Sequence, residues 1–78
     1  MPKQFSTYDL GLASALVVLE YRLVKLDKTN PKKVRFVFKQ QKGIDNAMLE
    51  YWNGKLELPA QKLFNAQKML KNRIYSDA

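Results

Sequence analysis

The sequence predicts a small α+β domain in which a two-stranded β-hairpin packs one face against three helices. Three observations predict this class: an apolar segment with helical spacing near the start, an alternating segment with turn-forming residues in the middle, and two helical stripes after it. No internal repeat, low-complexity tract or linker divides the 78 residues, so residues 1–78 are expected to form a single domain. The expected order is helix, β-hairpin, helix, helix.

The first helix is expected over residues 7–19. The sequence Ser6-Thr7-Tyr8-Asp9 fits the capping-box pattern, with Ser6 as the N-cap and Asp9 three residues later. Apolar residues then recur at helical spacing, at Tyr8, Leu12, Ala15, Leu16 and Leu19. Because the segment is apolar over most of its circumference, this helix should be largely buried.

The hairpin is expected to consist of strands at 21–27 and 33–40, joined by a turn at 28–32. In the second strand Val34, Phe36 and Phe38 alternate with mostly basic residues, so one face should lie in the core and the other in solvent. If Leu26 lies opposite Val34, the first strand places Val24 opposite Phe36 and Arg22 opposite Phe38. The solvent face then gathers Tyr21, Leu23, Lys25, Lys33, Arg35, Val37 and Lys39. The register stays open, because a slip of one residue would exchange the faces of the first strand.

Two more helices follow a loop at 40–43. The second helix has a stripe at Ile44, Ala47, Met48, Tyr51 and Trp52, and Asn53-Gly54 is expected to end it. Residues 55–58 form an extended link that is a candidate for a short third strand near Leu56. Pro59 suits the first turn of the last helix, expected over 59–75. Its core face would be Leu63, Ala66, Leu70 and Ile74.

The positive charge of the chain is concentrated in one segment. Eight of the fourteen basic residues lie between residues 22 and 42 with a single acid, Asp27, whereas the rest of the chain has six basic and six acidic residues. A concentrated positive field attracts polyanions, so we expect a non-enzymatic accessory or regulatory protein that contacts the backbone of RNA or DNA through the hairpin. The candidate contacts are Arg22, Lys25, Lys28, Lys32, Lys33, Arg35 and Lys39, with Lys68 and Lys71 extending the surface onto the last helix. Tyr21 and Tyr75 are candidates for stacking on bases.

Other interpretations of the same residues stay open. Many lysines on a sheet also keep a small protein soluble and protect sheet edges from pairing. The alternative function is a protein–protein interaction module, either a homodimer or an adaptor or small subunit of a larger nucleoprotein complex, with a phage-encoded inhibitor as a variant. The hairpin edge or the helix with Tyr51 and Trp52 would then be the interface. The sequence does not distinguish RNA from DNA, or single strand from duplex.

The residue types argue against several classes of protein. The chain has neither Cys nor His, which removes disulfides, the usual zinc ligands and the commonest acid–base and nucleophilic side chains. The carboxylates are dispersed, so we expect no enzyme activity, no metal and no cofactor. The apolar run at 10–19 is too short to cross a membrane. Asp9 before it, and the lack of a basic cluster at the start, argue against a signal peptide, so a cytoplasmic location is expected.

Four local patterns resemble a family of small prokaryotic and phage-associated domains of unknown function. These are FSTYDLGLASAL, VRFVF, YWNGKLELPAQKLFNAQKML and KNRIY, which together span nearly the whole chain. The family commonly has a glycine after the first helix, where this chain has Glu20, so the end of that helix is open. The resemblance implies the single-domain helix–hairpin–helix–helix arrangement and a phage-like or mobile-element setting, and it transfers no functional residues.

Overall fold

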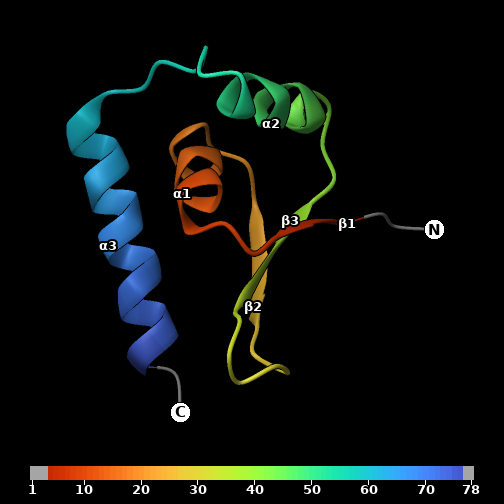
Figure 1. Cartoon of the computed structure of the whole chain (residues 1–78), viewed down its shortest axis with the longest axis vertical. Helices are drawn as coiled ribbons and strands as arrows, with labels where there is room; N and C mark the ends of the chain where they lie inside the picture. The colour runs from red at the N-terminus through yellow and green to blue at the C-terminus, as the bar shows by residue number, and fades with distance from the viewer. Residues whose placement is uncertain (1–3, 77–78) are drawn as a thin grey trace.

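A computed structural model describes residues 4–76, which form a three-stranded antiparallel sheet and three helices. The elements in chain order are β1 (Gln4–Thr7), α1 (Leu10–Val18), β2 (Leu23–Asp27), β3 (Arg35–Lys39), α2 (Ile44–Trp52) and α3 (Ala60–Ser76). Helix α1 lies between α3 and the sheet, and α2 covers one end of this arrangement (Figure 1). The predicted α+β class, the hairpin and the three helices are confirmed.

The third strand is β1, and it lies at the opposite end of the chain from the predicted strand near Leu56. The sheet order is β1-β3-β2, so β3 is the central strand. In β1, Phe5 pairs with Phe38 and is only 9% exposed. The prediction near Leu56 was wrong because β1 takes the second edge of β3, while residues 55–59 stay outside the sheet.

Helix α1 begins later than predicted. Ser6 belongs to β1, so its predicted role as N-cap was wrong. The N-cap is Asp9, whose Oδ1 accepts a hydrogen bond from the backbone N–H of Leu12 at 3.1 Å. Aspartate is as good an N-cap as serine. Because Ser6 and Thr7 pair with β3 as part of β1, the helix begins after Asp9. Tyr8, expected on the core stripe of the helix, therefore lies in the turn between β1 and α1 and is 57% exposed.

Helix α1 ends in a Schellman motif with an unusual residue at its centre. The N–H of Glu20 donates to the carbonyl of Val17 at 2.9 Å, and the N–H of Tyr21 donates to Leu16 at 3.0 Å. Glu20 has φ of 69°, the left-handed conformation that favours glycine. Helix α2 ends in the same motif, where Gly54 has φ of 70°, so the predicted stop at Asn53-Gly54 is confirmed.

The hairpin register differs from the expected one and contains an irregularity. Leu26 pairs with Phe36 instead of Val34, and Leu23 pairs with Phe38. Between Leu23 and Lys25 the register shifts, so Val24 is an extra residue, a β-bulge, and is 45% exposed. Beyond the bulge the alternation of β2 is reversed. Leu23 therefore turns to the core, although it was predicted on the solvent face.

One hydrophobic cluster connects the sheet with all three helices. It contains Phe5, Leu12, Ala13, Leu16, Phe36, Phe38, Ile44, Ala47 and Leu70. The predicted core face of α3 is confirmed, because Ala66 and Leu70 are buried while Leu63 and Ile74 are half-buried. On α2 the predicted stripe faces the core from Ile44 to Tyr51, with Met48 and Tyr51 half-buried against the cluster, but Trp52 is 59% exposed. In the region that the structure describes, every helix is too short or too polar to cross a membrane.

Candidate nucleic-acid interface

The sheet face that points away from α1 carries four cations, Arg22, Lys25, Arg35 and Lys39, and we name it the basic face. Phe36 and Phe38 of β3 point to the core, so Arg35 and Lys39 project from the other side. Lys25 shares that side because it pairs with Val37. The prediction that Lys25, Arg35 and Lys39 share one face is therefore confirmed.

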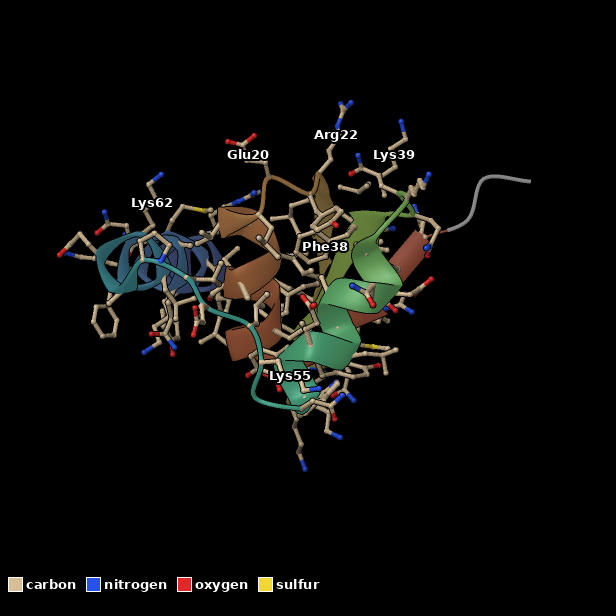
Figure 2. All side chains as sticks on the ribbon, turned by 90° about the horizontal axis from the view of Figure 1, so that it is seen from above. Glu20, Arg22, Phe38, Lys39, Lys55 and Lys62 are labelled. Atoms are coloured by element: carbon tan, nitrogen blue, oxygen red, sulfur yellow. The ribbon has the colours of Figure 1, made fainter. Side chains whose placement is uncertain are left out.

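The bulge at Val24 adds the fourth cation. The backbone N–H of Lys39 donates to the carbonyl of Arg22 at 2.9 Å, so the two residues lie side by side. Figure 2 shows both side chains extending to the same side of the molecule. The expected register placed Arg22 opposite Phe38 on the core side, and that pairing was wrong. Val37 was predicted to face solvent. It pairs with Ser6 and Lys25 on the basic face but is only 1% exposed, so that prediction was wrong.

Arg35 differs from the other cations of the basic face because it is paired with an acid. Its Nη2 donates to Oδ2 of Asp27 at 2.6 Å, across the β2–β3 pair. The other oxygen of Asp27 accepts hydrogen bonds from the side chain and the backbone N–H of Thr29. These bonds from Thr29, followed by the bond from Arg35, hold the pKa of Asp27 well below its usual value. The sole acid in the basic segment therefore stays ionised and offsets part of the charge of Arg35.

The turn of the hairpin is attached to the end of α3. The ammonium group of Lys28 donates to the carbonyl oxygens of Arg73 at 3.2 Å and Ile74 at 2.8 Å. A lysine at this position satisfies helix-terminal carbonyls and interacts favourably with the helix dipole. Lys28 thus has a structural contact in addition to its predicted role, whereas Lys32 is exposed in the turn.

Helix α3 is basic on two different sides. Lys62 extends to the same side of the molecule as Arg22 and Lys39, with Glu20 between them (Figure 2). At about 3.6 residues per turn, Lys71 lies about half a turn away from Lys62 around the helix, and Lys68 is about a third of a turn away. The two lysines predicted from the sequence therefore point away from that side. Arg73, about three turns after Lys62, shares its side. Lys62 and Arg73 were missed as candidate contacts in the sequence analysis. Their spacing of 11 residues, about three turns, on a helix without acidic residues is the signal that would have indicated them.

The three exposed or half-exposed tyrosines near these cations have different surroundings. Tyr21 is half-buried and packs against the hydrophobic cluster. Tyr75 is 84% exposed on the same side of α3 as Lys71. Tyr8 was missed as a candidate because it was assigned to the core. The ammonium group of Lys33 lies 5.6 Å from the centroid of the Tyr8 ring, close enough for a cation–π interaction.

A hollow of about 380 Å³ lies between Tyr8 and the hairpin, and we name it the tip hollow. Its lining consists of Tyr8, Asp27, Thr29, Asn30, Lys33 and Arg35. Within residues 4–76 no three His, Cys, Asp or Glu side chains are grouped in a way that could hold a metal ion. The chemistry that this region offers is therefore that of cations, an aromatic ring and hydrogen-bonding groups.

Comparison with known protein families assigns nearly the whole chain to one of them. The model of a family described as "Domain of unknown function (DUF5659)" matches residues 2–76, nearly the whole chain. No curated protein and no solved structure matches the chain significantly.

Proposed function

The chain belongs to the DUF5659 family of domains of unknown function, and we propose that it is a non-enzymatic accessory or regulatory protein that binds nucleic acid through the basic face. The observation that supports this proposal most strongly is the β-bulge at Val24. It brings Arg22 beside Lys39, so that four cations project from one side of one small sheet.

The arrangement suits contact with a phosphate backbone. From Arg35 to Lys39 the central strand advances about 13 Å, at about 3.3 Å per residue. That length spans several phosphates of a nucleic-acid backbone, since the spacing along one strand of a duplex is about 3.4 Å. Lys33 prolongs the row toward the turn. Such contacts neutralise phosphates and release counterions, but they carry little sequence information.

The proposal includes the cellular location of the protein and the complex in which it acts. The protein acts in the cytoplasm, alone or as a small subunit on a larger nucleoprotein complex. The prokaryotic or phage-associated setting that the sequence resemblance implies fits such a role. Its contribution there is binding, since the basic face consists of cations without an accompanying nucleophile or general base.

The proposal is tested with two variants that remove equal charge from different places. One variant replaces Arg22, Lys25 and Lys39 with Gln. The other replaces Lys55, Lys68 and Lys71 with Gln. Lys55 lies on the opposite side of the molecule from Arg22 (Figure 2). Binding to fluorescent RNA and DNA oligonucleotides is measured by anisotropy over a series of salt concentrations.

We expect the basic-face variant to reduce the slope of log affinity against log salt by about two to three, because each phosphate contact contributes about 0.7–0.9. The second variant should change the slope by less than one. Absence of binding by the wild-type protein at low salt would refute the proposal. Equal losses in the two variants would also count against it, since they would show a response to net charge alone.

A second candidate function is supported by the outer side of α2. Leu49 and Trp52, three residues apart on that helix, are 54% and 59% exposed. Exposed Trp beside another large apolar residue is typical of protein interfaces. For this alternative the protein would associate with itself or with a larger protein through α2. Sedimentation over a range of concentrations, with Leu49→Lys and Trp52→Lys variants, tests it: a concentration-dependent dimer that the variants abolish supports it, and a monomer throughout excludes the homodimer.

A further inference from the structure

The tip hollow combines an aromatic ring with two cations at one end of the basic face. Thr7 pairs with Phe36, so Tyr8 reaches the level of Arg35 on one side of the central strand. Asp27 pairs with Arg35 on the other side. The row from Tyr8 through Arg35 to Asp27 therefore crosses the sheet beside the hairpin turn. The ammonium group of Lys33 lies over the ring of Tyr8.

Two features of Tyr8 suit it to contact a flat ligand. Its side chain is 57% exposed although the ammonium group of Lys33 lies over the ring. It follows a strand that is paired along its whole length and precedes the Asp9 N-cap, so its backbone is held from both sides. With the backbone already held and only two side-chain torsions left to restrict, Tyr8 loses little conformational entropy when a ligand covers its ring.

The tip hollow is large enough for a planar ring system. Its volume of about 380 Å³ lies within the range of about 300–1,000 Å³ that small-molecule sites occupy. Its walls also carry hydrogen-bonding groups from the turn. The Asp27 carboxylate accepts a hydrogen bond from the N–H of Thr29, and the Asn30 side-chain oxygen accepts one from the N–H of Lys32, each at 2.9 Å. These two bonds hold the backbone of the turn in place.

We propose that Tyr8 stacks on an unpaired base whose neighbouring phosphates contact Lys33 and Arg35, and that the ligand of the basic face is therefore single-stranded nucleic acid. This inference rests on the proposed function and extends it. Cations alone bind single strands and duplexes alike, but an aromatic ring needs a base whose flat face is accessible. In a duplex the bases cover one another, whereas in a single strand they do not.

The test compares Tyr8→Ala and Tyr8→Leu with Tyr8→Phe, which keeps the aromatic ring. Tyr75→Ala is the matched control, because Tyr75 is also exposed but lies on the side of α3 away from Lys62. Three probes of equal length are used: a single strand, its duplex, and a single strand of the same backbone with abasic sites. Circular dichroism verifies that each variant is folded. If Tyr8→Ala does not fold, the comparison is made with Tyr8→Leu.

We expect the wild-type protein to prefer the single strand to the duplex and to bind the abasic strand more weakly. Tyr8→Ala and Tyr8→Leu should lose roughly 5- to 150-fold in affinity for the single strand, the range for one stacked base. Their affinity for the abasic strand and their salt slope should stay unchanged, because no phosphate contact is removed. Tyr8→Phe and Tyr75→Ala should bind like the wild type.

Several results would overturn the inference. If Tyr8→Ala and Tyr8→Leu bind the single strand like the wild type while the variant without Arg22, Lys25 and Lys39 does not, stacking is wrong and the proposed function stands. A lower salt slope in both Tyr8 variants would show that Tyr8 only positions Lys33. No binding of the wild type to any probe would reject the proposed function together with the inference.

Discussion

Asp27 and Arg35 form an ion pair of 2.6 Å across the β2–β3 hairpin, in the middle of the segment that holds most of the positive charge. The pair offsets one cation of the basic face. Replacing Asp27 with Asn should therefore raise the affinity for oligonucleotides several-fold at low salt, by about one additional phosphate contact. The measurement is the salt dependence of binding, whose slope should steepen by about 0.7–0.9.

The control for this prediction is Glu57→Gln, which changes the net charge equally at an exposed position of the link between α2 and α3. An equal gain in the control would mean that net charge, and not the release of Arg35, increases the affinity.

The same carboxyl group should make stability depend on pH in acid. Its folded pKa lies below the usual 3.8, because Thr29 and Arg35 stabilise the ionised form. Above that usual value the carboxylate is charged in both states and its stabilising contribution is complete. As the pH falls, the unfolded chain takes up the proton first, so the contribution is lost on the way down to the folded pKa. The melting temperature of the wild type should thus fall more between about pH 5 and about pH 2 than that of Asp27→Asn. Parallel curves would contradict the assignment.

Glu20→Gly should stabilise the protein. Glu20 has φ of 69° at the end of α1, a conformation that costs a side chain roughly 1–2 kcal/mol and glycine almost nothing. After the greater flexibility of glycine in the unfolded state is taken into account, a gain of about 0.5–1 kcal/mol remains. Thermal unfolding measures it as a rise of a few degrees. Glu20→Ala removes the same charge without relieving the backbone, and a similar rise in that variant would show that the charge is responsible.

Gly11 of α1 leaves room for the side chain of Tyr51 from α2. A Cβ atom at this position would collide with the hydroxyl of Tyr51, which donates to Oδ1 of Asp9 at 3.4 Å. Alanine elsewhere in a helix is about 1 kcal/mol better than glycine, but here the collision should outweigh that gain. We expect Gly11→Ala to destabilise the wild type and to be better tolerated, or stabilising, in a Tyr51→Phe background. Urea unfolding of the four proteins in this cycle measures the difference, and additive effects would show that the two residues do not interact.

The elements that could be predicted are those whose signal lies within one segment. Helical periodicity and a glycine at the C-terminal end predicted α2, and periodicity with a proline at the start predicted α3. Alternation around Phe36 and Phe38 predicted β3 and the side on which Arg35 and Lys39 lie. The start of α1 was predicted wrongly because two good N-caps, Ser6 and Asp9, compete locally, and pairing with a distant strand decides between them.

The sequence by itself therefore determined the α+β class, the three helices, the hairpin and the concentration of charge in it. Only the tertiary structure decided that β1 makes β3 the central strand, that a bulge at Val24 turns Arg22 to the basic face, and that Tyr8 lies beside Lys33. Strand neighbours and bulges are properties of a pair of segments far apart in the chain. The free energy that favours this strand order and this bulge comes from burying Phe5 and Leu23 against Phe38. These contacts join separate segments, so no pattern within one segment predicts them.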